Sequence, residues 1–294
     1  MALKIAAHAK INLTLYITGK REDGYHTLNT IMQSLSLADI ITLELNNTGV
    51  ISVECDNHEL AGDRNLAYKA AYSFLSVLNE KKIGVRIFIE KHIPLAAGLG
   101  GGSADAAAVL AGLNLLFHEP LTINELLTLA LPLGADVPFC LVGGTCLATG
   151  IGEKLQSLPD CPDWKVLLIK PCDKASTGEM YQKYDENNGL SAVENCVIID
   201  GIGAKDLALV AKNLYNDFQP LYEGQAVSDA LLALKNNGAL GASLSGSGPT
   251  VFGLFDDELC SMSAFEQLKQ TYSACAITQF SARGWHLIEK GIQL

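Results

Sequence analysis

The sequence predicts an α+β fold with largely antiparallel sheets, divided into two domains. Predicted strands and helices mix along the chain without the regular alternation that accompanies a parallel sheet. With 294 residues, 49% of them hydrophobic, the chain can bury a sizeable core and has room for two domains of ordinary size. Two prolines interrupt the pattern in Pro159-Asp160-Cys161-Pro162-Asp163, which we interpret as a linker. We therefore expect an N-terminal domain over residues 1–157 and a C-terminal domain over residues 158–294.

The N-terminal domain is predicted to begin with strands. Apolar and polar residues alternate from Ile11 to Ile17, and a period of two is typical of a β-strand. The segment Arg21-Glu22-Asp23-Gly24 predicts a turn, because Asp-Gly favours tight turns. Residues 40–45 and 49–55 are predicted to form further strands.

Helical spacing appears next along the chain. Over residues 65–79 apolar side chains recur every three to four positions, and Asp63 is the expected helix cap. Residues 85–89 are a predicted strand that leads into a glycine-rich loop. The alanine-rich segment 103–117 is the helix after that loop, and another helix is predicted over residues 122–134.

A glycine pair suggests a hairpin after these helices. The predicted hairpin covers residues 138–155 and has Gly143-Gly144 at its centre. The predicted elements of the C-terminal domain are strands at 165–170, 250–255 and 275–281 and helices at 176–184, 206–215, 226–237 and 258–272.

The composition excludes several classes of protein. The formal net charge of −11 argues against nonspecific binding to nucleic acid or to an anionic membrane. The eight cysteines are scattered and mostly lie in apolar runs, so we interpret them as buried thiols and expect neither disulfides nor a zinc site. The sequence starts without a signal-peptide core, and no apolar run reaches the roughly 18 residues that a membrane span needs. We expect a cytoplasmic monomer or homodimer that acts on a small molecule, with no nucleic-acid or membrane partner.

The most informative segment is the loop from Pro94 to Asp105, which reads PLAAGLGGGSAD. Its four glycines leave the backbone free to adopt positive φ angles and remove side chains that would keep a ligand away. Because a helix follows, unpaired N–H groups and the positive end of the helix dipole lie at the loop. The loop therefore predicts a phosphate site. The alternative is an ordinary turn in which Ser103 caps the helix.

This loop matches none of the common nucleotide-binding or hydrolase motifs. A P-loop requires a lysine before its serine, and Gly102 stands there. Ser103 occupies the last glycine position of the dinucleotide fingerprint G-x-G-x-x-G. No serine in the chain lies in a G-x-S-x-G nucleophile elbow. The predicted phosphate site therefore belongs to another class.

Three polar residues are candidates for catalysis. Lys10 and Asn12 stand two apart in the first predicted strand, so they share a face, and an amine with an amide there suits a phosphate and a substrate hydroxyl. The alternative is a solvated strand face. Asp136 places a carboxylate in an apolar run that continues with Pro138. It either caps a helix or accepts a proton from an alcohol, provided that a cation such as Lys10 balances its charge.

Two further segments suggest contacts with a ligand. Tyr25 and His26 follow the predicted turn and offer a ring face beside a hydrogen-bonding edge, which suits a nucleobase. The alternative for Tyr25 is ordinary packing. A second loop, from Gly238 to Thr250, is rich in glycine and serine and predicts a backbone that passes close to a ligand or to another loop.

Together these segments resemble the motifs of the GHMP kinases, the superfamily named for galacto-, homoserine, mevalonate and phosphomevalonate kinases. The glycine loop 94–105, Gly134-Ala135-Asp136 and the second loop 241–250 correspond to its three motifs. Ala9-Lys10-Ile11-Asn12-Leu13 and Gly24-Tyr25-His26 are similar to the branch whose substrate is a cytidine-diphosphate-linked sugar alcohol. The resemblance covers essentially the whole chain. It implies the two-domain GHMP kinase architecture with the active site in the interdomain cleft.

The resemblance also implies an activity and a role for each matching residue. The activity is ATP-dependent phosphorylation, with Mg²⁺, of the 2-hydroxyl of that cytidylyl substrate in non-mevalonate isoprenoid biosynthesis. Asp136 corresponds to the base or hydroxyl-orienting group, and Lys10 stands beside it. Tyr25 and Tyr181 correspond to the two faces of the cytosine site, and His26 to its edge. The remaining correspondences are Asn12 and Thr177 on the substrate side, and Asn65, Lys91, Pro94, Gly98, Leu99, Gly100, Gly101, Gly102 and Ser103 on the nucleotide side.

Two alternative functions remain open from the sequence. Another GHMP kinase, of the homoserine or mevalonate type, would share the loops, but its substrate carries no base for Tyr25 and His26 to bind. A nucleotide-sensing module without catalysis would bind ATP and would not depend on Asp136.

Overall fold

The computed structural model describes residues 2–173, 176–187 and 192–290. Strands and helices mix in an α+β arrangement, and the sheet is mostly antiparallel, as the sequence predicts. The strands are β1 (Ala2–Lys20), β2 (His26–Asn46), β3 (Ile51–Cys55), β4 (Gly84–Glu90), β5 (Thr145–Gly150), β6 (Lys154–Ser157), β7 (Lys165–Ile169), β8 (Tyr215–Asn216), β9 (Gly241–Leu244), β10 (Val251–Phe255), β11 (Cys275–Ser281) and β12 (Trp285–Lys290).

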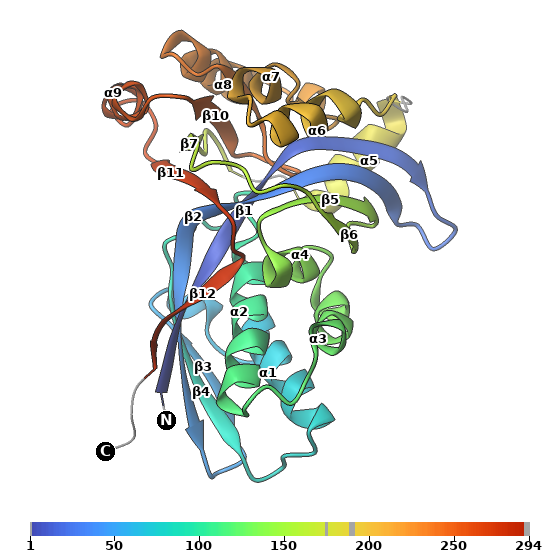
Figure 1. Ribbon diagram of the computed structural model, residues 1–294, viewed down its shortest axis with the longest axis vertical. Helices are drawn as coiled ribbons and strands as arrows, with labels where there is room; N and C mark the ends of the chain where they lie inside the picture. The colour runs from blue at the N-terminus through green and yellow to red at the C-terminus, as the bar shows by residue number, and fades with distance from the viewer. Residues whose placement is uncertain (1, 174–175, 188–191, 291–294) are drawn as a thin grey trace.

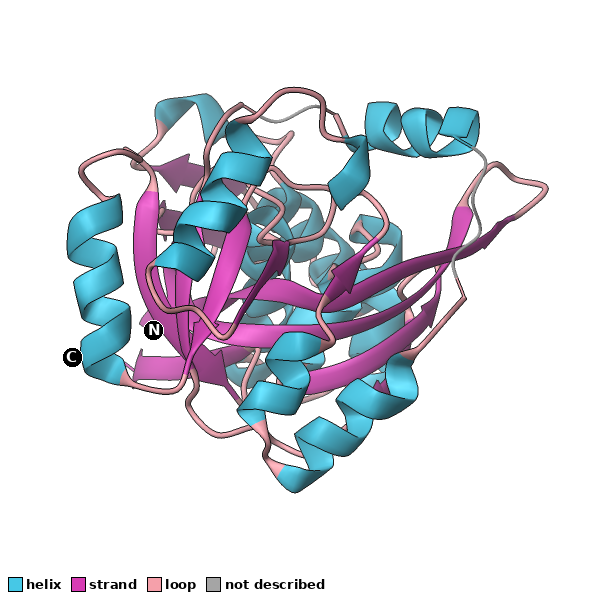
Figure 2. Cartoon of the chain, turned by 90° about the horizontal axis from the view of Figure 1, so that it is seen from above, coloured by secondary structure: helices cyan, strands magenta, loops and turns pink. Residues whose placement is uncertain are grey.

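The helices lie around the strands in the view from above (Figure 2). The α-helices are α1 (Leu66–Val77), α2 (Gly101–Leu116), α3 (Ile123–Ala130), α4 (Val137–Val142), α5 (Thr177–Asn187), α6 (Asn195–Ala204), α7 (Leu207–Lys212), α8 (Ala226–Asn236) and α9 (Glu258–Leu268). Short 3₁₀ helices are η1 (His58–Leu60), η2 (Leu131–Leu133) and η3 (Gln219–Leu221).

Two long antiparallel strands, β1 and β2, form the spine of the molecule (Figure 1). Each changes partner along its length: β2 pairs in turn with β5, β11 and β4, and β1 pairs with β8 and β12. Strands from both sequence halves therefore share one sheet, with the order β12-β1-β2-β11-β7-β10-β9 along its main path. Residues 158–164 form neither helix nor strand. The domain boundary at 157/158 stays a prediction.

Helix α2 is the centre of the main hydrophobic core. From Ala104 onward all of its residues except Leu115 are buried, and most of the buried ones in its first half are alanines. Small side chains let the helix approach the strands closely: a Cβ added at Gly112 would lie 2.4 Å from Ile5 Cδ1 on β1 and 2.5 Å from Leu43 Cδ1 on β2. Tight packing here fixes the start of α2, and the glycine loop with it, relative to β1.

The predicted hairpin over residues 138–155 is wrong in its first arm. Residues Val137–Val142 form α4, with Pro138 in the first turn, where its missing N–H costs nothing. Gly143, with φ of 74°, ends that helix instead of turning a hairpin. The hairpin that does form joins β5 to β6.

Several other boundaries differ from the prediction. Asn65, not Asp63, caps α1, since its side chain accepts the Ala67 N–H. The helix predicted over 206–215 ends at Lys212 and is followed by the short strand β8. No element is predicted from the sequence for α6, β9, β12 or the part of β2 before residue 40. Strand β9 lies in a small-residue segment with low strand propensity, and α6 contains β-branched residues that weaken the helical pattern.

The cysteine thiols of the protein are free, and some of them are buried. All eight cysteines are free, but only Cys55, Cys140 and Cys146 are buried and Cys196 is exposed, so the expectation of generally buried thiols is only partly correct. Within the described residues no helix has the length and apolar character to span a membrane.

Candidate active site

A cavity of about 900 Å³ lies between the two sequence halves. Its wall combines parts of β1 and β2, the glycine loop, the start of α2, the residues before α4, helix α5 and the second glycine loop. All of the candidate residues predicted from the sequence line this cavity except Asn65. A pocket of this size can enclose most of a nucleotide-sized ligand.

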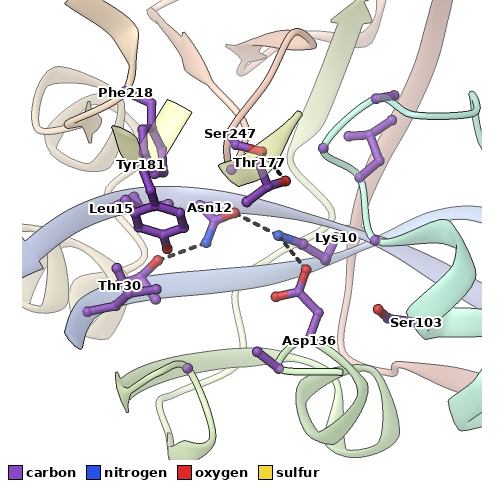
Figure 3. Close-up of a pocket in the computed structure, with 18 of the residues that line it drawn as sticks. Lys10, Asn12, Leu15, Thr30, Ser103, Asp136, Thr177, Tyr181, Phe218 and Ser247 are labelled. Atoms are coloured by element: carbon purple, nitrogen blue, oxygen red, sulfur yellow. Dashed lines mark hydrogen bonds and ion pairs between the residues drawn. The ribbon is translucent and has the colours of Figure 1, made fainter. Parts of the chain in front are cut away.

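Lys10, Asn12 and Asp136 meet on the cavity wall (Figure 3). Lys10 Nζ donates to Asn12 Oδ1 at 2.9 Å and forms an ion pair with Asp136 Oδ2 at 3.1 Å. Lys10 and Asn12 are only 4% and 3% exposed, so the alternative of a solvated strand face is wrong. The side chain of Asp136 is 39% exposed. A buried ammonium is stabilised by such a carboxylate, and the carboxylate remains accessible from the cavity.

Irregular pairing of β1 places these side chains. The register between β1 and β2 shifts between His8 and Lys10 and again between Asn12 and Thr14. Between the two shifts, the Lys10 backbone N–H donates to the Leu99 carbonyl of the glycine loop at 3.0 Å. Bulges of this kind redirect side chains next to functional sites. The segment that carries Lys10 and Asn12 is thereby attached to the loop as well as to β2.

Asp136 occupies the N-cap position of α4 but does not cap it. Its side chain accepts no hydrogen bond from that helix, and its backbone is in the αR region at φ −83° and ψ −16°. The carboxylate pairs with Lys10 instead. Of the two alternatives that the sequence left open, the helix-capping role is therefore wrong.

The glycine loop requires glycine at two positions. Gly98 has φ of +77°, and a Cβ there would lie 2.4 Å from the Ser245 carbonyl oxygen. Gly100 has φ of +71°, and a Cβ there would lie 2.9 Å from Lys10 Cγ. Helix α2 then begins at Gly101 with no side-chain cap, so the alternative in which Ser103 caps the helix is wrong. The first N–H groups of an α-helix have no intrahelical partner, and the residues that carry them here line the cavity.

The second glycine loop packs directly on the first, which confirms the expectation of a close approach between loops. Ser245 Oγ donates to the Gly98 carbonyl at 3.1 Å, and the Thr250 N–H donates to the Ala97 carbonyl at 3.3 Å. Asn216 Nδ2 donates to the Leu244 and Gly246 carbonyls at 2.8 and 2.9 Å and so holds the second loop in place.

Aromatic residues line the opposite end of the cavity. The rings of His26 and Tyr181 are stacked at 4.5 Å, and Tyr181 packs edge-on against Phe218 at 4.9 Å. Tyr25 is 62% exposed at the tip of the β1–β2 hairpin. Thr177 Oγ1 and Ser247 Oγ, 3.0 Å apart, connect α5 to the second glycine loop.

His26 is held by a carboxylate from α5. His26 Nε2 lies 2.7 Å from Asp185 Oδ1, and Lys20 Nζ donates to Asp185 Oδ2 at 2.5 Å. The hydrogen bonds from Lys20 and from His26 lower the pKa of Asp185. Both strands of the β1–β2 hairpin are thereby joined to α5 next to their turn.

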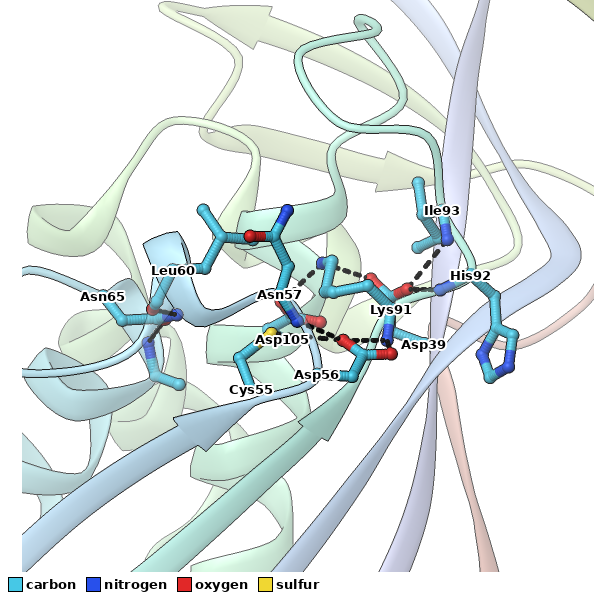
Figure 4. Close-up of polar contacts among 11 residues, drawn as sticks. Asp39, Cys55, Asp56, Asn57, Leu60, Asn65, Lys91, His92, Ile93 and Asp105 are labelled. Atoms are coloured by element: carbon cyan, nitrogen blue, oxygen red, sulfur yellow. Dashed lines mark hydrogen bonds and ion pairs between the residues drawn. The ribbon is translucent and has the colours of Figure 1, made fainter. Parts of the chain in front are cut away.

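A buried charge cluster lies beneath the glycine loop (Figure 4). Lys91 Nζ lies 2.5 Å from Asp39 Oδ2 and 2.8 Å from Asp105 Oδ2. Burial raises the pKa of Asp105 to about 7, and its Oδ1 has no hydrogen-bond partner. Asn65 lies nearby, but its side chain is bound to backbone groups of η1 and α1: Oδ1 accepts the Ala67 N–H and Nδ2 donates to the Leu60 carbonyl, each at 2.8 Å.

Comparison with known proteins identifies the family. The model of the GHMP kinases N terminal domain matches residues 65–144, and that of the GHMP kinases C terminal matches residues 198–274. A protein of Desulfitobacterium hafniense (strain Y51) named 4-diphosphocytidyl-2-C-methyl-D-erythritol kinase is 45% identical over 87% of this chain and 88% of its own length. The chain belongs to the 4-diphosphocytidyl-2-C-methyl-D-erythritol kinase family.

Further relatives agree with this family. A kinase of the same name from Caldanaerobacter subterraneus subsp. tengcongensis is 41% identical over 100% of both chains. A crystal structure of 4-(cytidine 5'-diphospho)-2C-methyl-D-erythritol kinase superposes with a TM-score of 0.80 at 31% identity, covering 95% of this chain and 99% of the other. A homoserine kinase from Cytophaga hutchinsonii, at 20% identity and a TM-score of 0.76 over 98% and 97% of the two chains, shares the fold.

Several residues in and beside the site of this kinase have no role predicted from the sequence. They are Thr30 and Asp185 on the cavity wall, and Asp39 and Asp105, which pair with Lys91. A polar residue among apolar neighbours was the available signal for Asp105, which lies in an alanine-rich helix, since a buried polar side chain needs a partner. Thr30 lies in a strand segment of mixed polar and apolar residues, where no such signal exists. Asp185 lies on a mostly polar helix, where nothing in the local pattern distinguishes it from solvated residues.

Proposed function

We propose that this chain transfers the terminal phosphoryl group of ATP to the 2-hydroxyl of 4-diphosphocytidyl-2-C-methyl-D-erythritol. The observation that carries the proposal is the Lys10–Asp136 ion pair at 3.1 Å, which shares one cavity with an uncapped helix N-terminus. Phosphoryl transfer depends mainly on positioning and on stabilising charge, and these two features supply both.

In the proposed reaction the substrate hydroxyl hydrogen-bonds to Asp136. The oxygen of the substrate hydroxyl forms a bond to the terminal phosphorus of ATP, and the bond from that phosphorus to ADP breaks. The hydroxyl proton passes to the Asp136 carboxylate. The Lys10 ammonium stabilises the negative charge on the transferred group. The N–H groups at the start of α2, over Gly101 to Ser103, bind the phosphates together with the positive helix dipole. Pro94, Gly98, Leu99 and Gly100 shape that loop around them.

Mg²⁺ is proposed as the partner of the nucleotide. The described residues contain no cluster of three or more His, Cys, Asp or Glu side chains that could hold a metal ion. Mg²⁺ commonly binds to substrate phosphates and to one or two protein oxygens, and Asp136 and Ser103 carry oxygens on the cavity wall. These residues therefore fit an ion that arrives with ATP, and such an ion would neutralise phosphate charge.

The aromatic end of the cavity is proposed to bind cytosine. We assign Tyr25 and Tyr181 to stacking on the base, His26 to hydrogen-bonding to its edge, and Asn12 and Thr177 to the rest of the substrate. Stacking and edge contacts together discriminate one base from another. On the nucleotide side we assign Lys91, and Asn65 as the residue next to the cavity wall. We further propose a cytoplasmic monomer or homodimer without a nucleic-acid partner, in keeping with the net charge of −11.

A substrate panel tests the proposal. The purified chain is mixed with ATP, Mg²⁺ and one of homoserine, mevalonate or the cytidylyl sugar alcohol, and ADP is measured. We expect turnover only with the cytidylyl substrate, and phosphorus NMR should place the new phosphate on its 2-hydroxyl. Turnover of homoserine or mevalonate would assign a different kinase. ATP binding without ADP formation from any substrate would indicate a sensing module.

A further inference from the structure

We propose that Thr30 is a positioning residue for phosphoryl transfer, acting through Asn12 on Lys10. The inference rests on the proposed function. Thr30 lies on β2, is 1% exposed and stands at the end of a hydrogen-bonded chain that begins at Asp136 (Figure 3). Lys10 Nζ contacts Asp136 and donates to Asn12 Oδ1; Asn12 Nδ2 donates to Thr30 Oγ1 at 2.8 Å; Thr30 Oγ1 donates to the Thr14 carbonyl.

The donor and the acceptor of each hydrogen bond in this series, from Lys10 through Asn12 and Thr30 to Thr14, are fixed. An ammonium has no lone pair, so Lys10 can only donate, and the Thr14 carbonyl has no proton, so it can only accept. The Asn12 amide must therefore present its oxygen to Lys10 and its NH₂ to Thr30. The Thr30 hydroxyl can accept that N–H because its own proton is donated to Thr14. Each end of the chain thus supports the same orientation of the amide.

Thr30 also connects the two strands where their pairing is irregular. It pairs with Leu15, just beyond the register shift between Asn12 and Thr14. In the same place the Ile31 N–H donates to Thr14 Oγ1 at 3.0 Å. The side chains of Thr14 and Thr30 thus take the place of regular ladder bonds next to Asn12.

The Asn12 amide retains unused hydrogen-bonding capacity toward the cavity. An amide offers two N–H donors and two lone pairs, and the chain uses one of each. Asn12 lines the cavity, so the remaining N–H and lone pair are available to substrate. Thr30 thereby fixes a side chain that serves both the catalytic lysine and the substrate.

Removing the Thr30 hydroxyl should lower turnover more than ATP affinity. Thr30→Val leaves a buried N–H of Asn12 without a partner, so the amide rotates and Lys10 loses one of its two anchors. We expect kcat to fall about tenfold, with the KM for ATP within about twofold of the wild type. Thr30→Ser should restore kcat to within about twofold, because it retains the hydroxyl. Thr30→Ala serves in place of the valine variant if the latter does not fold.

A double-mutant cycle with Asn12→Ala separates positioning from general stability. In the Asn12→Ala background, Thr30→Val should change kcat less than about twofold, because the residue through which Thr30 acts is gone. Thr145→Val is the matched control: Thr145 is a buried threonine outside the cavity whose hydroxyl donates to Gln33, so its loss should lower the melting temperature and leave kcat unchanged. Equal losses in both backgrounds, or full activity of Thr30→Val, would overturn the proposal.

A readout independent of turnover distinguishes this inference from the proposed function. A hydrogen-bonded, buried Lys10 ammonium should give a slowly exchanging ¹⁵N NMR signal in the wild type and in Thr145→Val. The same signal should broaden or disappear in Thr30→Val and return in Thr30→Ser. If the panel shows no turnover but this pattern holds, the proposed function fails and the positioning role stands. An unchanged Lys10 signal in Thr30→Val would overturn the positioning role.

Discussion

The two ends of the cavity are built in different ways. At the transfer end, Lys10 is buried between Asn12 and Asp136, and two glycine loops contact each other through backbone carbonyls. At the base end, Tyr25 is 62% exposed, and the Lys20–Asp185 pair joins side chains that are 52% and 36% exposed. The difference lies in the cation, since the Lys10 side chain is 5% exposed although its partner Asp136 is as accessible as Asp185. A charged group stabilises developing charge best when it is shielded from water and fixed, whereas a stacked base needs mainly a flat apolar surface.

Asp136→Asn should produce the largest effect, because it removes the proton acceptor at the transfer end. We expect kcat to fall about 1,000-fold, within the range that general bases contribute, while ATP binding stays within about threefold. Steady-state kinetics would measure kcat, and calorimetry would measure the affinity for ATP. Asp163→Asn, an exposed aspartate in the segment between β6 and β7, is the control. Full turnover of Asp136→Asn would refute the proposed role.

Gly98→Ala should be next in size and should act on ATP. Alanine at a φ of +77° is strained, and its Cβ would meet the Ser245 carbonyl, so the two glycine loops must separate. We expect the KM for ATP to rise about 100-fold, with a smaller rise for the cytidylyl substrate. Gly62→Ala is the control, because it introduces the same kind of strain at φ +95° but has no atom within 4 Å of the added Cβ. If both variants bind ATP equally well, contact between the loops does not shape the phosphate site.

Asp105 should give the transfer end a pH-dependent stability. Burial raises its pKa from 3.8 to about 7 in the folded state, so its neutral form stabilises the fold fully below pH 3.8 and that contribution is lost as pH rises through 7. Urea unfolding should show that the free energy of unfolding of the wild type decreases from pH 5 to pH 8. In Asp105→Asn this decrease should be smaller by about 2 kcal/mol. Asp163→Asn should keep the wild-type decrease. An unchanged decrease in Asp105→Asn would show that other groups cause it.

The tyrosines should give the smallest effect and act only on the cytidylyl substrate. Tyr25→Ala and Tyr181→Ala each remove a ring from the base end, and we expect the KM for that substrate to rise about tenfold, with the KM for ATP unchanged. Tyr72→Ala is the control, because Tyr72 is 61% exposed on α1 and lies outside the cavity. Equal rises for both substrates would contradict a stacking role.

Much of the fold and of the site was predictable from local signals. Alternation identified β1, the glycines and alanines identified the loop and α2, and the order of the motifs identified the superfamily. These signals are local because φ preferences, side-chain period and helix propensity are properties of neighbouring residues. The hairpin over 138–155 failed for the same reason: a glycine pair suits a turn as well as a helix end, and only the packing of α4 against α2 decides between them.

The sequence by itself determined which residue types were available to bind phosphate, to accept a proton and to bind a nucleobase. It also determined roughly where most helices and strands lie along the chain. Only the tertiary structure decided which of them meet. Lys10 is buried because α2 and the glycine loop cover its strand, and Asp136 reaches it because α4 begins beside that loop. Thr30, Asp39 and Asp185 acquired their roles from partners distant in sequence. Periodicity records the environment of a residue and not the identity of its partners, so these contacts follow only from the packed chain.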